Sequence, residues 1–390
     1  MPAFEQKKQP GLKPGDRLSG YSLKRVETLA EIRSVYFELE HDRTGARHVH
    51  IQNDDHENTF SVAFKTVPTD STGVAHILEH TVLCGSRKYP VRDPFSTSNQ
   101  PEVSMNAFTA SDWTMYPFST QNRKDFYNLM DVYLDATFYP TLGELNFKQE
   151  GIRLEPVPAA DSGQPSKLVY KGVVYNEMKG AMSSPDQVMA RSLLNALYPD
   201  TTYSHNSGGD PAAIPQLTHS QLIAFHRRHY HPSNAYFYTY GDLPLAEHLA
   251  FIDRKVLTHF ARIDPQTEVI SQPRWPGPRT VTCPYPFDKG EDPAKKYQVC
   301  LAWLTADIQD TFEVLVLTLL EQILLGNSAS PLRKALIDSG LGTALSDAAG
   351  FVPDHRDTMF AAGLKDVQQA DAGQVAAIDG GRPGARRGRP

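Results

Sequence analysis

Residues 76–80 read His76-Ile77-Leu78-Glu79-His80, and this stretch is the most informative part of the chain. On an α-helix each residue turns by about 100°, so His76 and His80 lie about 40° apart and Glu79 about 60° from His76. Two neutral imidazoles in this arrangement can ligate one zinc ion, and the carboxylate can accept a proton from water. The spacing predicts zinc ligands at His76 and His80 and a general base at Glu79. The alternative interpretation is a solvated helix face.

The bulk composition excludes several classes of function. The chain has 390 residues, enough for two or more domains, with 40% hydrophobic and 22% charged residues. A net charge of −6 gives no footprint for nucleic acid, and no basic stripe indicates a membrane surface. The longest apolar run, 314–325, is too short and too polar to span a bilayer. We therefore expect neither nucleic acid nor a membrane among the partners.

Cysteine usage and the first residues predict a cytoplasmic location. The three cysteines are odd in number and widely spread, which indicates no disulfide framework. Residues 1–18 contain no apolar signal core and no Arg-rich amphipathic stretch.

Cys84, four residues after His80, is either a fourth soft ligand or a small buried residue at the helix end.

Strand-like and helix-like segments come in mixed order, which predicts an α+β fold. Alternating apolar residues predict a hairpin over 34–53 with a turn at 42–45 and a strand over 61–67. Amphipathic periodicity predicts helices over 122–138 and 218–229, with another beginning near Asn176 after strand-like Val173-Val174. Further expected elements are strands over 236–240, 297–304 and 358–364 and a helix over 311–325.

Composition shifts predict the domain boundaries. A proline-rich linker over 264–286 separates the domain with the expected zinc ligands, 1–263, from a second domain, 287–369, that we expect to be incomplete. Residues 370–390 are rich in glycine, proline and arginine and predict a disordered, non-native tail, a functional basic tail being the alternative.

The flanks of the histidine motif resemble a known family. The order H-x-x-E-H is the inverzincin signature. The chain resembles the presequence protease branch of the pitrilysin/insulin-degrading enzyme family, and it corresponds only to the N-terminal portion of those proteins. The segments that carry this resemblance are 73–90, 92–95, 105–112, 116–120, 172–180, 207–211 and 229–235. Looser similarity extends from about residue 20 to residue 369.

The resemblance implies the third zinc ligand, which spacing leaves open. A catalytic zinc site needs three protein ligands, and the downstream candidates are Glu144, Glu150, Glu155 and Glu177. In the family the ligand is the glutamate of an N-E-M-K-G stretch, which corresponds to Glu177. A rival site at His226, His229 and His231 is opposed by the neighbouring cations Arg227 and Arg228.

The resemblance also implies how a substrate binds. The residues Asn106, Ala107, Phe108 and Thr109 look like the family's edge strand, to which a peptide adds through its backbone; an ordinary sheet strand is the alternative. Two departures stand out. Residues 96–104 are polar where relatives carry an apolar helical segment, and relatives are two to three times longer, with a C-terminal half that completes the site.

These observations together predict an inverzincin-type domain followed by an incomplete second domain of similar type. The expected function is that of a metalloendopeptidase, with one Zn²⁺ ion, that degrades short unfolded peptides and is weakly active alone. The alternatives are a non-catalytic zinc-binding fragment and one half of a two-subunit peptidase that needs a C-terminal half or partner chain.

Overall fold

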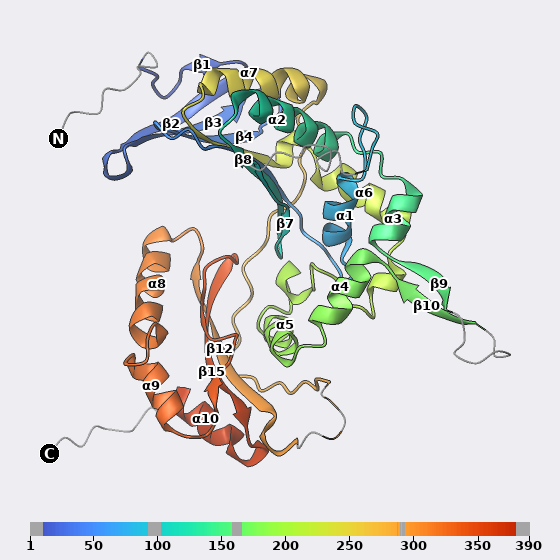
Figure 1. The fold of residues 1–390 in the computed structure, drawn as a ribbon. Coiled ribbons are helices and arrows are strands. Elements are labelled where there is room, and N and C mark those ends of the chain that lie inside the picture. Colours follow the sequence, from blue (N-terminus) through green and yellow to red (C-terminus); the bar gives the residue numbers. More distant parts are fainter. Residues whose placement is uncertain are drawn as a thin grey trace. The chain divides into compact units, whose positions relative to one another are not determined.

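The computed structural model describes residues 11–92, 103–157, 166–286, 288, 290 and 293–379. The chain folds into two compact units, Met1–Met178 with Ser207–Glu268 and Lys179–Asn206 with Val269–Pro390 (Figure 1). Residues 179–206 thus belong to the second unit, whereas the sequence places them in the first domain. The proposed division at 264–286 stays a prediction.

A single large sheet forms the frame of the first unit. Its strand order is β1-β2-β3-β4-β11-β5-β8-β6, and β7 also pairs with β8. The strand β11 runs parallel to β4 and antiparallel to β5. The predicted hairpin over 34–53 is confirmed, because β3 and β4 pair antiparallel. The strands are β1 (Arg17–Leu18), β2 (Tyr21–Leu29), β3 (Ser34–His41), β4 (Arg47–Gln52), β5 (Asn58–Lys65), β6 (Val103–Met105), β7 (Phe108–Thr109), β8 (Trp113–Thr120) and β11 (Ala235–Gly241).

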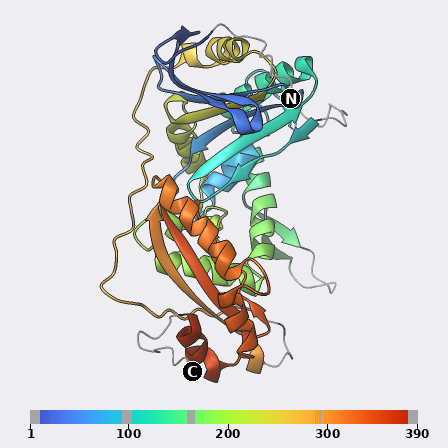
Figure 2. The ribbon, with the colours of Figure 1, turned by 90° about the vertical axis from the view of Figure 1, so that its left-hand side faces the viewer.

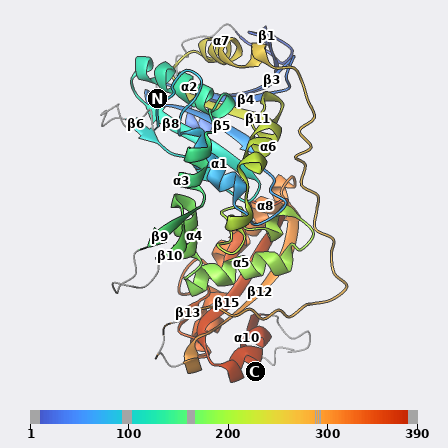
Figure 3. The same ribbon diagram turned by 90° about the vertical axis from the view of Figure 1, so that its right-hand side faces the viewer.

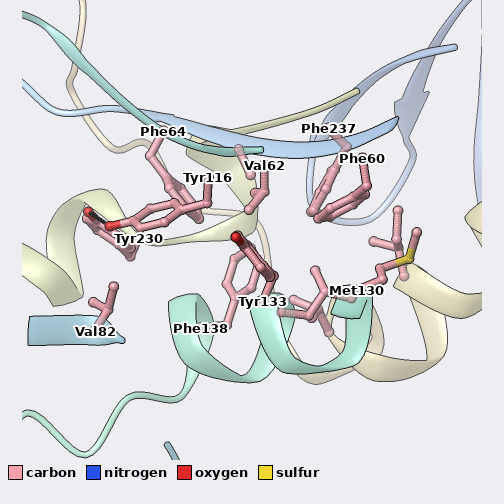
Figure 4. Close-up of a cluster of buried hydrophobic side chains, with 14 of the residues drawn as sticks. Phe60, Val62, Phe64, Val82, Tyr116, Met130, Tyr133, Phe138, Tyr230 and Phe237 are labelled. Carbon is pink, nitrogen blue, oxygen red and sulfur yellow. Dashed lines mark hydrogen bonds between the residues drawn. The ribbon is translucent and has the colours of Figure 1, made fainter. Parts of the chain in front are cut away.

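Helices cover one face of this sheet because its strands alternate buried and less buried residues. Phe60, Phe64 and Phe237 of the strands meet Tyr133 and Phe138 of α2 in one aromatic core (Figure 4). The helices of this unit are α1 (Val74–Val82), α2 (Arg123–Phe138), α3 (Glu144–Glu150), α4 (Val173–Ala181), α6 (His219–His229) and α7 (Leu245–Lys255). A separate ribbon pairs β9 (Arg153–Val157) with β10 (Lys167–Lys171).

Local sequence explains where two of these helices begin. The side chain of Asn122 accepts hydrogen bonds from the backbone of Lys124 and Asp125 at the start of α2. At the start of α6, Thr218 and Gln221 form a reciprocal capping box. Both starts lie where the sequence predicts them.

The second unit holds a smaller sheet between helices. Its order is β12-β15-β13, with β14 also paired to β15. Opposite views show α8 and α9 along one face of this sheet and α5 across the other (Figures 2 and 3). The elements are α5 (Pro185–Leu197), β12 (Tyr297–Asp307), α8 (Thr311–Leu325), α9 (Pro331–Asp338), β13 (Ala344–Leu345), β14 (Gly350–Val352), β15 (Asp357–Val367) and α10 (Ala372–Asp379). Short 3₁₀ turns lie at Ala30–Ile32, Thr202–Ser204, Ile214–Gln216, Pro232–Asn234, Leu257–His259, Pro293–Lys295 and Gln369–Asp371.

Two expectations need correction. Val173 and Val174 open the helix α4 rather than a strand, because Val174 is fully buried in the first unit and packing outweighs the β preference of valine. The expected disorder from residue 370 is wrong up to Asp379, since Val375 of α10 packs with Leu336 and Leu364 in an apolar cluster. Residues 380–390, and 96–102 of the divergent segment, lie outside the described residues.

Candidate functional site

The helix α1 carries His76 and begins at a close backbone contact between Gly73 and Gly209. Gly73 has a φ of 71°, and a Cβ there would lie 2.8 Å from the Cα of Gly209. Only glycine suits both conditions, so the start of α1 lies against residues 208–209. The carbonyl of Gly208 accepts a hydrogen bond from Nδ1 of His76 over 3.0 Å. This contact leaves the Nε2 atom of His76 free for a ligand.

His80 is held on its Nδ1 side by a buried carboxylate. The Nδ1 atom of His80 lies 3.3 Å from Oε2 of Glu150, the last residue of α3. Burial opposes the charged imidazole, but Glu150, Glu79 and Glu177 outweigh it and raise the pKa of His80. The imidazoles of His76 and His80 face each other edge-on, with ring centroids 5.0 Å apart.

Glu177 completes a cluster with the two histidines. It projects from α4, and its Oε2 atom lies 3.7 Å from Nε2 of His76. One ligand atom from each of His76, His80 and Glu177 lies within 4.8 Å of the others, and no other such group occurs among the described residues. Two zinc bonds of about 2.0–2.2 Å span at most about 4.4 Å. The set therefore fits one ion after a small inward shift, which the 54% exposed side chain of Glu177 permits.

Glu79 lies beside this cluster. The sequence gives no sign of the hydrogen bond between its carboxylate and Thr109. Its side chain is buried, at 9% exposure, and its Oε2 atom accepts a hydrogen bond of 2.6 Å from the hydroxyl of Thr109. The hydroxyl of Thr109 also lies 3.4 Å from that of the buried Thr114. One carboxylate oxygen of Glu79 is thus oriented by the sheet, next to two imidazoles and a second carboxylate.

The four expected substrate-binding residues lie at the margin of the sheet. Phe108 and Thr109 form β7, which pairs with β8 on the side opposite β5. Asn106 and Ala107 lie between β6 and β7 rather than in a strand, although the amide of Asn106 donates to the carbonyl of Pro117. Phe108 is 45% exposed. The structure therefore places a short outer strand beside Glu79, and its role in substrate binding stays a prediction.

The alternative ligands have other partners. The thiol of Cys84 is buried and contacts the carbonyl of His80. His226 pairs with the carbonyl of Thr137, His229 with that of Phe225, and His231 accepts from the amide of Ser233. These three imidazoles serve separate backbone contacts and do not converge.

Two family models match the chain. Residues 67–174 match "Insulinase (Peptidase family M16)", and residues 216–372 match "Peptidase M16 inactive domain". The first match contains His76, Glu79 and His80. The chain belongs to the M16 peptidase family, and members of its presequence protease branch match the chain with their N-terminal portion.

The relatives bear the name "Presequence protease, mitochondrial". The chain is 49% identical to that of Xenopus tropicalis over 368 residues, 94% of this chain and 36% of the relative. The mouse protein is 48% identical over 367 residues, 93% of this chain and 35% of its own length. The chain thus spans about a third of the length of these relatives.

Two solved protease structures share the fold of the chain. Pitrilysin superimposes with a TM-score of 0.63 at 17% identity, over 92% of this chain and 37% of pitrilysin. A protease from Helicobacter pylori gives the same TM-score at 17% identity, over 91% of this chain and 78% of that one. The mixed sheet-and-helix fold predicted from the sequence is confirmed.

The predicted cytoplasmic location is wrong, because the relatives are named as mitochondrial proteins. The prediction rested on a targeting segment not being recognisable, and such an absence does not establish a compartment. None of the helices that the structure describes combines the length and apolar character needed to cross a membrane.

Proposed function

We propose that this chain is the zinc-binding catalytic part of a metalloendopeptidase that hydrolyses short unfolded peptides. The observation that carries the proposal is the convergence of His76, His80 and Glu177 within 4.8 Å. Glu79 stands beside them with one oxygen held by Thr109. The M16 matches and the relatives' names support peptide hydrolysis, with mitochondrial presequences among the substrates.

The residues have distinct roles in this mechanism. His76, His80 and Glu177 would hold the ion, which when bound supplies a Lewis acid that polarises the scissile carbonyl and acidifies water. Glu79 accepts the proton of the attacking water and delivers it to the leaving amine. The hydroxyl of Thr109 keeps the carboxylate of Glu79 in place during both transfers.

The outer strand β7 offers a place where an extended peptide substrate can bind. A peptide that adds to Phe108 and Thr109 through backbone hydrogen bonds would be recognised with little regard to its side chains. Because Thr109 contacts Glu79, such a peptide would lie next to the general base. This arrangement favours unfolded peptides, since a folded protein does not offer a free strand.

Metal analysis of variants tests the proposed site. The wild-type chain is expected to bind one equivalent of zinc, and His76→Ala, His80→Ala and Glu177→Gln are each expected to lose most of it, because two ligands compete poorly with water. The matched control is Glu144→Gln, which alters an exposed candidate glutamate paired with Lys148. Full zinc content in Glu177→Gln would remove this residue from the ligand set, and a wild type without zinc would refute the proposed function.

We further propose that full activity needs additional polypeptide, such as a C-terminal half. The chain spans 36% of the Xenopus tropicalis relative, and α8 exposes an unusual run of apolar side chains. Phe312 is 74% exposed, Leu319 56% and Ile323 63%. Contiguous exposed apolar surface is typical of a surface that another polypeptide covers.

The isolated chain is therefore expected to cleave peptides at least ~100-fold more slowly than a full-length relative, because one missing donor to the developing oxyanion alone costs about 10²–10³ in turnover. A quenched fluorescent peptide reports the rate with and without the C-terminal part of the Xenopus tropicalis relative. That addition is expected to restore part of the rate. Turnover by the isolated chain equal to that of the relative would contradict this proposal.

A further inference from the structure

Glu150 is a buried carboxylate for which the sequence suggests only a role as a direct ligand. It ends α3 and is 4% exposed. A buried carboxylate is unfavourable unless both oxygens are paired. Here Oε2 faces Nδ1 of His80 at 3.3 Å, and Oε1 accepts from the guanidinium of Arg92. Both oxygens of Glu150 therefore have a hydrogen-bond partner. The carboxylate lies on the Nδ1 side of the His80 ring and leaves the Nε2 side open.

The protonation of these groups follows from their chemistry. An ionised carboxylate can only accept hydrogen bonds, so the Nδ1 atom of His80 must be the donor. The guanidinium of Arg92, a permanent cation, donates to the other oxygen of Glu150, so both carboxylate oxygens act as acceptors. In neutral imidazole a proton on Nδ1 leaves Nε2 as a lone-pair donor. His76 is held in the same sense by the carbonyl of Gly208.

The backbone around Glu150 places it with little freedom. A Cβ on Gly151 would lie 3.1 Å from the side chain of Ile77 in α1, and a Cβ on Gly172 would lie 1.9 Å from the carbonyl oxygen of Gly151. Gly151 follows Glu150, and Gly172 precedes the helix α4 that carries Glu177. The two glycines therefore join the end of α3 to α1 on one side and to the start of α4 on the other.

We propose that Glu150 is a positioning residue of the metal centre, which fixes the ring of His80 with Nε2 directed to the ion and is itself held by Arg92. The inference rests on the proposed zinc site. It assigns Glu150 a role distinct from that of Glu177, although the sequence offers both as ligands. Carboxylates that hold a ligating histidine in this way contribute about 10–100-fold to metal affinity.

Zinc affinity, measured by competition with a chromophoric chelator, tests this role without requiring turnover. Glu150→Gln is expected to bind zinc about 10-fold more weakly and Glu150→Ala up to about 100-fold more weakly, with one site retained. The control is Asp135→Asn, which alters another buried, hydrogen-bonded carboxylate of the same unit that accepts from Ser86 and from the backbone of Lys88. It is expected to leave zinc affinity unchanged.

A measurement on the unaltered protein covers the case in which the Glu150 variants do not fold. In zinc-loaded wild-type chain, nitrogen-detected NMR of the histidine rings is expected to show the His80 proton on Nδ1. A proton on Nε2 would overturn the proposal, as would Glu150→Gln with wild-type zinc affinity while His80→Ala loses zinc. If the wild type itself binds no zinc, the proposed function fails instead.

Discussion

Replacing Glu79 by glutamine is expected to leave one zinc ion bound and to lower peptide hydrolysis by about 10²–10⁴-fold. The amide keeps the size of the carboxylate, and its oxygen can still accept the hydrogen bond that Thr109 donates to Glu79. It cannot take a proton from water at neutral pH. The loss should therefore appear in turnover and not in zinc content, unlike that of the ligand variants.

The experiment compares wild type and Glu79→Gln in the most active assembly available, with a quenched fluorescent peptide and zinc analysis of the same samples. Glu31→Gln, on the exposed turn Ala30–Ile32, is the matched control and should keep both properties. Turnover of Glu79→Gln within a few fold of wild type would show that another group transfers the proton.

The metal-free chain is expected to lose several kcal/mol of folding stability between pH 7.5 and pH 5. Burial lowers the pKa of His226 and of His229 to about 4, and burial together with the neighbouring His50 lowers that of His48 to about 3. Burial also lowers the pKa of His50 to about 4. An unfolded histidine titrates near about 6.5. Above that pH these histidines are neutral in both the folded and the unfolded chain, so they do not make the stability depend on pH.

As the pH falls below about 6.5, the unfolded chain binds protons that the folded chain excludes until about pH 4, so stability is lost through this window. At pH 5 each such histidine accounts for a loss on the order of 2 kcal/mol, against a total stability of about 5–15 kcal/mol for a domain. His48 and His50 share the hydroxyl of Thr239, so their losses are not additive. The measurement uses the metal-free protein because zinc released at low pH would also change the free energy of unfolding.

Urea unfolding at pH 7.5, 6 and 5 gives the free energy of unfolding directly. His226→Gln keeps a donor for the carbonyl of Thr137 and removes one titrating group, so its loss between pH 7.5 and pH 5 should be smaller by on the order of 2 kcal/mol. The exposed His259→Gln is the control and should behave like wild type. Equal pH dependence in His226→Gln and wild type would exclude His226 as a source of the acid sensitivity.

Features set by local spacing could be predicted from the sequence. Residues 76–80 place two imidazoles and a carboxylate on one helix face, and the structure has them on α1. The capping residues Asn122 and Thr218 mark the starts of α2 and α6. The apolar run closed by Gly326 forms α8 over Thr311–Leu325, as predicted. In each case the hydrogen bonds and the side-chain period involve residues only a few positions apart.

What the sequence alone left open depends on contacts between distant residues. Glu144, Glu150, Glu155 and Glu177 are equivalent as letters, and only the family resemblance singled out Glu177. The tertiary structure separates them: Glu177 lies 3.7 Å from Nε2 of His76, whereas Glu150 faces Nδ1 of His80, 70 positions earlier in the chain.

By itself, then, the sequence determined which side chains share the α1 face, because helical periodicity is a local property. The tertiary structure decided the side of each imidazole on which a carboxylate lies, the contact of Thr109 with Glu79, and the helical state of Val173 and Val174. These depend on the close packing of α1, α3 and α4 at Gly151 and Gly172. Such packing joins residues far apart in the chain, and no periodicity in the sequence encodes it.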